Sequence, residues 1–247
     1  MPSARPPRNP SSISAGRSGD VQRVLGLNGL GPRRVSLPPS EKTAGASSGR
    51  ADTQHENVPD DSSMTIADGR PYRFGHRIDG DWKPYSYPAV FESGRRIVAG
   101  VCDYDLTVFE HMVECLQPPF RLLYVLHTPR GEARPGRYQS PELSLAQVKT
   151  FVTQFHSLLA GDGRFDLWAY AALDEATVVW DRHNLLYAYG PLARFDSALR
   201  RMGFASGVPQ IPGPHQHCYW PQLDPVARDL MSTFDWSYSP LRPEDEQ

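Results

Sequence analysis

Hydrophobic positions recur with a helical period in four parts of the chain. The clearest helix is predicted to begin at Ser144, because Gln147 follows at the spacing of a capping box. Apolar residues then recur every three or four positions until Gly161. Three further helices are predicted over residues 105–116, 192–202 and 224–234.

Runs rich in β-branched, aliphatic or aromatic residues predict about five strands, over residues 96–102, 120–127, 165–171, 176–180 and 185–189. The second run is almost continuously apolar, which is typical of the middle of a sheet. The last three runs are joined by brief polar turns, a spacing that predicts an antiparallel meander. We therefore expect an α+β fold with a mixed or antiparallel sheet of about five strands and about four helices mainly on one face.

The segment before these elements is crowded with aromatic residues, glycine and proline. It predicts either an irregular entry over residues 72–87 or a short hairpin around Asp79 and Gly80. At the other end of the chain, a proline-rich irregular stretch is expected over residues 208–221, and fraying is expected after Trp236.

Aromatic residues divide the chain at Tyr72. All 11 tyrosines, 10 phenylalanines and 5 tryptophans lie at or after this position, whereas residues 1–63 contain 8 prolines, 11 serines and 7 glycines. Such a segment buries too little surface to offset the entropy lost on ordering, which is about 1–2 kcal/mol per residue. We therefore expect a disordered tail over residues 1–66, one domain over residues 67–238 and a disordered end over residues 239–247.

Met64 lies where the composition changes. Across the chain arginine outnumbers lysine 23 to 3, which indicates a GC-rich coding sequence. Translation of such DNA upstream of a true start yields a segment rich in Arg, Pro, Ser, Gly and Ala, as found here before Met64. We hypothesise that Met64 is the biological start of the protein.

Charge and hydropathy limit the partners of the domain. Residues 64–247 contain 18 basic and 22 acidic side chains, so this part is mildly acidic, whereas nucleic-acid binding favours a basic surface. No apolar stretch approaches the roughly 20 residues that cross a bilayer, and no secretory signal precedes Tyr72. We therefore expect no nucleic acid, no membrane and a cytoplasmic location. The three cysteines lack CxxC spacing, which disfavours a disulfide framework or a cysteine zinc site.

The first candidate site is the polar turn over residues 181–184, between two predicted strands. Asp181 stands two residues from His183, and a carboxylate at that spacing can orient an imidazole and raise its basicity for general-base catalysis. Asp181 and His183 are therefore the candidate catalytic residues. The alternative is that Asp181 and Asn184 bind the backbone of the turn while His183 is simply solvated.

The second candidate site is the pair His215 and His217. In an extended segment these side chains face the same way, about 6.5–7 Å apart, so both imidazoles could bind one divalent transition metal. A catalytic site would need a third ligand, for which Asp181, His183 and Asp224 are candidates. The alternative is that the two imidazoles pack among their aromatic neighbours.

Function is not determined by any common motif. The chain contains no GxGxxG, GxxxxGK[ST], GxSxG or HExxH motif and no EF-hand loop. Seven tyrosines and tryptophans fall in predicted loops, where such side chains supply binding area, although a small domain also builds its core from aromatic residues. The sequence favours a non-enzymatic domain that binds a protein partner or a small molecule. The alternative is a metal-dependent or His/Asp-assisted hydrolase that uses His215 and His217.

Overall fold

The structure, a computed structural model, describes residues 71–245. The expected tail over residues 1–66 and the proposed start at Met64 lie outside the described residues, as do residues 246 and 247. Helices and strands are both abundant in the described part, which confirms the predicted α+β class.

The large sheet has nine strands in the order β10-β3-β4-β9-β8-β7-β5-β6-β12. Every neighbouring pair is antiparallel except β10 and β3, so the sheet is mixed. The strands are β3 (Val90–Ser93), β4 (Ile97–Gly100), β5 (Phe120–Leu126), β6 (Gly136–Gln139), β7 (Phe165–Ala171), β8 (Ala176–Trp180), β9 (Leu185–Tyr189), β10 (Ala205–Ser206) and β12 (Ser237–Ser239). The predicted meander is confirmed as β7, β8 and β9.

A second, smaller sheet has the order β11-β1-β2 and is antiparallel throughout. Its strands are β1 (Phe74–Ile78), β2 (Asp81–Pro84) and β11 (His215–His217). The hairpin of β1 and β2 turns at Asp79 and Gly80, both with positive φ, as one of the two sequence interpretations expected. The third strand comes from the far end of the chain, and this pairing positions the candidate metal ligands.

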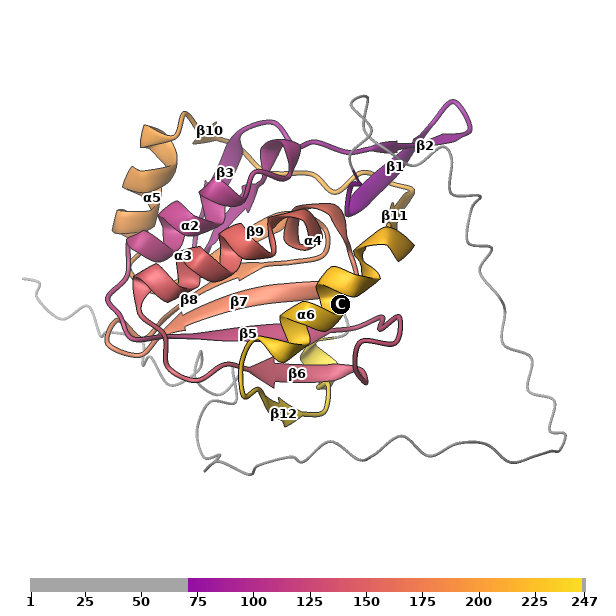
Figure 1. Ribbon diagram of the computed structural model, residues 1–247. Helices are drawn as coiled ribbons and strands as arrows, with labels where there is room; N and C mark the ends of the chain where they lie inside the picture. The colour runs from indigo at the N-terminus through magenta and orange to yellow at the C-terminus, as the bar shows by residue number, and fades with distance from the viewer. Residues whose placement is uncertain (1–70, 246–247) are drawn as a thin grey trace, which may run out of the picture. The chain divides into compact units, whose positions relative to one another are not determined.

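Five α-helices are described: α2 (Leu106–Glu114), α3 (Leu145–Gln154), α4 (His156–Gly161), α5 (Leu192–Arg201) and α6 (Asp224–Ser232). The capping box at Ser144 is present, with the Ser144 hydroxyl accepting from the backbone N of Gln147. Figure 1 shows α2, α3, α4 and α6 in front of the large sheet. Short 3-10 turns lie at Cys102–Tyr104, Pro221–Leu223 and Pro243–Asp245. No helix of the described residues has the length and apolar character needed to cross a membrane.

Alternate residues of the central strands build the core between the large sheet and these helices. In β5 these residues are Phe120, Leu122, Tyr124 and Leu126, all fully buried. The same alternation in β7 and β8 extends the core, which is why these strands were evident in the sequence. Each fully buried large side chain of this kind contributes about 1.5–3 kcal/mol to folding.

The predicted number of about five strands was wrong, because the large sheet alone has nine. The strands that the sequence missed are short or polar: β3, β6, β10, β11 and β12, with sequences such as GRYQ in β6 and HQH in β11. Such strands form through backbone pairing with a neighbour and have no apolar alternation of their own. The single helix predicted after Ser144 is likewise divided, into α3 and α4, at Phe155.

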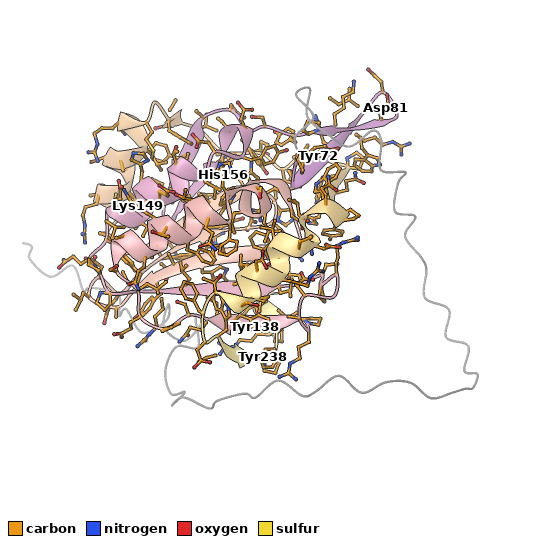
Figure 2. The ribbon with its side chains drawn as sticks, in the orientation of Figure 1. Tyr72, Asp81, Tyr138, Lys149, His156 and Tyr238 are labelled. Atoms are coloured by element: carbon orange, nitrogen blue, oxygen red, sulfur yellow. The ribbon has the colours of Figure 1, made fainter. Side chains whose placement is uncertain are left out.

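The end of the chain also differs from the expected fraying after Trp236. β12 pairs with β6 and brings the rings of Tyr138 and Tyr238 to a centroid distance of 5.3 Å (Figure 2). Asp245 is buried and accepts a hydrogen bond from Arg137 at 2.5 Å. A buried ion pair of this kind depends on a partner more than 100 positions away, so no local pattern predicts it.

Candidate metal centre

His183 lies in the turn between β8 and β9, residues 181–184. Asp181 closes this turn, because its Oδ1 accepts a hydrogen bond from the backbone N of Leu185 at 2.8 Å and its backbone N donates to Leu185 O at 2.9 Å. The backbone N of Asn184 donates to Asp181 O at 3.1 Å. These bonds fix the backbone on both sides of His183, so that its ring has a defined position.

Asn184 stabilises the same turn from within the core. Its backbone is left-handed, with φ 62°, a conformation that asparagine tolerates better than most residues. Its Oδ1 accepts from Nε1 of Trp180 at 2.9 Å, and its Nδ2 donates to Val101 O at 2.8 Å. The side chain is fully buried, so these bonds replace those that it would make to water.

Asp166 holds the turn from the neighbouring strand β7. Its Oδ1 accepts from the backbone N of Arg182 at 2.7 Å, and its Oδ2 accepts from Nε2 of His127 at 3.0 Å. Burial raises the pKa of Asp166, but the hydrogen bonds and positive charge of His127 and Arg182 outweigh burial and lower the pKa below its usual value. The carboxylate is therefore ionised at neutral pH and accepts both bonds.

His215 and His217 lie on β11, which pairs with β1 in the small sheet. The register places His217 opposite Phe74 and His215 opposite His76. Because residues two apart on a strand point to the same face, both imidazoles lie on one side of this sheet.

A close backbone contact sets the position of β11. The backbone N of Gly163 donates to Cys218 O at 2.9 Å, and the backbone N of Cys218 donates to Arg73 O at 3.0 Å. A Cβ atom on Gly163 would lie 2.4 Å from Arg73 O and 3.2 Å from Cβ of His217. Only glycine fits at this position without displacing the backbone around His217.

The turn and β11 bring three imidazoles together: His183, His215 and His217. One ring nitrogen of each lies within 4.8 Å of the others, and no other group of three histidine, cysteine or acidic side chains in residues 71–245 has this spacing. The ring centroids are 4.8 Å apart for His183 and His217, 5.4 Å for His183 and His215, and 6.0 Å for His215 and His217. A zinc ion, with bonds of about 2.0–2.1 Å, would draw the nitrogens to roughly 3.4 Å from one another. Because His215 is exposed, its ring has room for this small movement.

Hydrogen bonds already orient two of the rings. Nδ1 of His183 donates to Oδ2 of Asp181 at 3.0 Å, and Nδ1 of His215 donates to Pro212 O at 3.0 Å, which leaves Nε2 of each ring as an acceptor. Metal-binding histidines commonly donate their other N–H to a carboxylate or a backbone carbonyl in this way. Nδ1 of His217 is buried and has no hydrogen-bond partner among the described residues. Bonding to an ion would satisfy this nitrogen.

The surroundings keep His217 in the form that binds metals. Burial, followed by the neighbouring His183, Arg182 and His215, lowers the pKa of His217 to about 3. The imidazole is therefore neutral at physiological pH, as a ligand must be. His183 and His217 are half-buried whereas His215 is exposed, so the cluster is accessible from the side of His215.

Phe74 forms the apolar floor of the cluster. Its ring centroid lies 5.7 Å from that of His183, 5.3 Å from His215 and 5.9 Å from His217. Phe74 is fully buried, and Tyr85 contacts its ring at 6.0 Å. An apolar floor of this kind excludes water from one side and strengthens electrostatic interactions at the centre.

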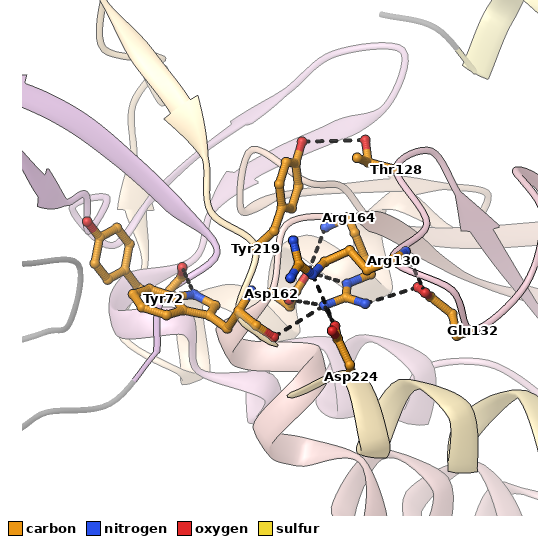
Figure 3. Close-up of polar contacts among 9 residues, drawn as sticks. Tyr72, Thr128, Arg130, Glu132, Asp162, Arg164, Tyr219 and Asp224 are labelled. Atoms are coloured by element: carbon orange, nitrogen blue, oxygen red, sulfur yellow. Dashed lines mark hydrogen bonds and ion pairs between the residues drawn. The ribbon is translucent and has the colours of Figure 1, made fainter. Parts of the chain in front are cut away.

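A buried ionic network fixes the chain that follows β11 (Figure 3). Arg164 makes a bidentate pair with Asp162, with both distances 2.8 Å, and also binds Glu132 at 3.1 Å and Asp224 at 2.9 Å. Oδ2 of Asp162 also accepts from the backbone N of Trp220 at 3.0 Å. The network therefore joins the start of β7 and the start of α6 to the segment that carries His215 and His217.

The structure brings together all four residues that the sequence singled out, Asp181, His183, His215 and His217. Asp224, the remaining candidate for a third ligand, instead binds Arg164 and, at 3.1 Å, Nε of Arg130. The third imidazole comes from His183. The side chain that the alternative interpretation left solvated in the turn therefore faces β11.

Sequence reasoning missed the residues that position the cluster, chiefly Phe74, Gly163 and Asp166. One signal could have identified Asp166, because it is the single charged residue in the otherwise apolar and aromatic run of β7. Gly163 and Phe74 have no comparable signal, since their roles depend on contacts with β11.

The chain was also compared with known proteins. No protein-family model matches it, and no match was found among curated proteins or among solved structures. The geometry of the histidine cluster is therefore the basis for assigning a function.

Proposed function

We propose that the protein binds one divalent transition-metal ion through His183, His215 and His217 and acts as a metal-dependent hydrolase. The observation that supports this is the convergence of three imidazoles from two separate segments, two of them already oriented by hydrogen bonds. Three protein ligands leave a fourth position for water or substrate, which distinguishes catalytic from structural zinc sites. Imidazole ligands suit zinc, copper, iron and nickel.

The charge of the ligand set favours hydrolysis. Three neutral imidazoles leave the full positive charge of the ion in place, which lowers the pKa of a bound water to about 7. Asp181 accepts bonds on both of its oxygens, one from His183 and one from the backbone of Leu185. We therefore assign Asp181 the role of orienting His183 and raising its basicity.

The sequence favoured a different function, a non-enzymatic binding domain, because of seven aromatic residues in predicted loops. Three of these, Tyr87, Tyr138 and Trp220, are buried. The aromatic surface available to a partner is thus smaller than the sequence indicated. The histidine cluster, by contrast, has a third imidazole beside the two that the sequence placed together.

Metal analysis of the full chain tests the proposal. We expect one ion per chain after incubation with zinc and dialysis, and hydrolysis of 4-nitrophenyl acetate that a chelator removes and added zinc restores. His156→Ala is a matched control, because His156 is exposed on α4 and lies outside the cluster. A chain that retains no stoichiometric metal, or whose hydrolysis is unaffected by the chelator, contradicts the proposed function.

Asp181→Asn tests the orienting role of the carboxylate. The amide retains an oxygen for the backbone of Leu185 but removes the negative charge beside His183. We expect metal affinity to fall about 10- to 100-fold, the usual effect of losing such an outer hydrogen-bond partner. Competition with a chromophoric chelator measures the affinity, and thermal unfolding of the metal-free variant shows whether the turn is intact. An affinity equal to that of the wild type in a folded variant would mean that Asp181 does not act on His183.

A further inference from the structure

One face of the small sheet extends from the histidine cluster toward the β1–β2 hairpin. The register pairs His215 of β11 with His76 of β1, and His76 with Lys83 of β2. Directly paired residues point to the same face, and neighbouring strands lie about 4.8 Å apart. Lys83 therefore begins about 10 Å from His215, in one straight row across three strands.

Ring contacts establish independently that His76 lies on the face of the cluster. The ring of His76 contacts Tyr85 at 4.8 Å, Tyr85 contacts Phe74 at 6.0 Å, and Phe74 contacts His215 at 5.3 Å. These distances form a continuous path of rings from His76 to the metal ligands. The backbone N of Tyr85 also donates to Phe74 O at 3.1 Å, which continues the pairing of β2 with β1.

The row places two basic side chains beside the cluster without a described acidic partner. Lys83 is exposed and is one of three lysines in the chain. Within residues 71–245, neither Nζ of Lys83 nor the ring nitrogens of His76 make a hydrogen bond or ion pair. By contrast, Lys149 on α3 is paired with Glu114. Among the strands of the small sheet, the acidic residue on this face is Asp81, in the next row outward, and Figure 2 shows it at the far end of the hairpin.

We propose that this row, His76 and Lys83, binds the phosphoryl group of a phosphate ester that is the substrate of the metal centre. The inference rests on the proposed function. The ammonium of Lys83 and a ring nitrogen of His76 are hydrogen-bond donors to phosphoryl oxygens, and the positive charge of Lys83 stabilises their negative charge. A neutral carboxylic ester presents no such charge. Asp81 lies one row beyond His76 and Lys83, so its negative charge disfavours a phosphate at the outer end of the hairpin. A phosphate is therefore favoured on the side of the row that faces the metal ligands.

The reaction consumes one water for each ester bond. A metal ion held by the three imidazoles would supply a hydroxide, formed when a bound water loses a proton to solvent, and this hydroxide would attack phosphorus. His76 and Lys83 would hold the non-bridging oxygens. The bond from phosphorus to the ester oxygen breaks, and that oxygen leaves with the electron pair and takes up a proton from solvent. The products are an alcohol and the phosphate with one ester bond fewer.

Lys83→Met in the zinc-loaded full chain tests the inference, with Lys149→Met as the matched control. Loss of a hydrogen bond to a charged group predicts a fall of about 10- to 100-fold in kcat/KM for 4-nitrophenyl phosphate. Turnover of 4-nitrophenyl acetate and the zinc content are expected to equal those of the wild type, and Lys83→Arg to restore most of the loss. Inorganic phosphate is expected to inhibit acetate hydrolysis competitively in the wild type and about tenfold more weakly in Lys83→Met.

Each result that departs from these expectations leads to a different conclusion. If zinc-dependent acetate hydrolysis is present but phosphate does not inhibit it, or Lys83→Met behaves as the wild type, the phosphoryl site is wrong and the hydrolase stands. If Lys83→Met instead lowers turnover of 4-nitrophenyl hemisuccinate selectively, the bound anion is a carboxylate and the phosphate-ester assignment is overturned. If the chain binds no metal, both proposals fail together. A loss of zinc in His76→Ala would make His76 a ligand and also overturn the assignment.

Discussion

His215→Ala is expected to abolish tight metal binding while leaving the fold intact. His215 is exposed, and its side chain makes one hydrogen bond, to Pro212 O. Its removal therefore leaves no cavity and no buried polar group. Zinc-finger peptides bind zinc with roughly 10–16 kcal/mol shared among four protein ligands. At a similar contribution per ligand, the loss of His215 predicts an affinity lower by about 100- to 1,000-fold.

Two measurements check this result. Zinc is expected to raise the unfolding temperature of the wild type, since a ligand that binds only the native state stabilises it, but to have little effect on His215→Ala. Isothermal titration gives the affinity directly, with His156→Ala as the control for removal of an exposed imidazole. Equal affinity in His215→Ala and the wild type would falsify the three-histidine centre. The exposed ligand is the better one to remove, because His217 is half-buried and its replacement by alanine would also leave a cavity in the protein.

Asp162→Asn is expected to lower the free energy of unfolding by about 3–5 kcal/mol, the usual cost of removing one partner from a buried ion pair. Asp162 and Arg164 are fully buried and form a bidentate pair. The neutral amide cannot accept both hydrogen bonds of the Arg164 guanidinium or balance its charge. The remaining acidic partners of Arg164 are then Glu132 and the partly exposed Asp224. Urea unfolding at neutral pH measures the difference.

The control for this prediction is Asp196→Asn. Asp196 forms an ion pair with Arg200 four residues later on α5, where both side chains are partly exposed. An exposed pair of this kind contributes about 0.3–0.5 kcal/mol, so the control should unfold almost as the wild type does. A loss below about 1 kcal/mol in Asp162→Asn would show that the pair is not structurally important. A folded Asp162→Asn variant should also bind zinc more weakly, because Asp162 holds the backbone of Trp220 just beyond β11.

The candidate centre is assembled from two segments with different kinds of support. The turn that carries His183 is fixed by Asp166 on β7, by Trp180 on β8 and by Asn184 within the turn itself. The segment that carries His215 and His217 is fixed by backbone bonds to Arg73 and Gly163. A centre built this way is held in position before any ion binds, which lowers the entropic cost of binding.

The local pattern of the sequence was sufficient to predict the helices and strands that have strong apolar periodicity. β5, β7, β8 and β9 and helices α2 and α5 lie where the sequence placed them, within a few residues at their ends. Together α3 and α4 cover the helix that was predicted to run from Ser144 to Gly161. Their periodicity follows from backbone geometry, which repeats every 2 or 3.6 residues whatever the rest of the chain does. The α+β class follows from the same information.

Only the tertiary structure decided that His183 meets His215 and His217. The sequence singled out Asp181, His183, His215 and His217, but the two clusters are more than 30 positions apart. Their meeting depends on the pairing of β11 with β1. That strand is three residues long and polar, and a shift of one residue in its register would turn both imidazoles to the opposite face. Its register is set by the close approach of Gly163 to Arg73 and by the contact of Phe74 with the histidine rings. These contacts join residues that are far apart in the chain, so they cannot be predicted from the spacing of residues along the sequence.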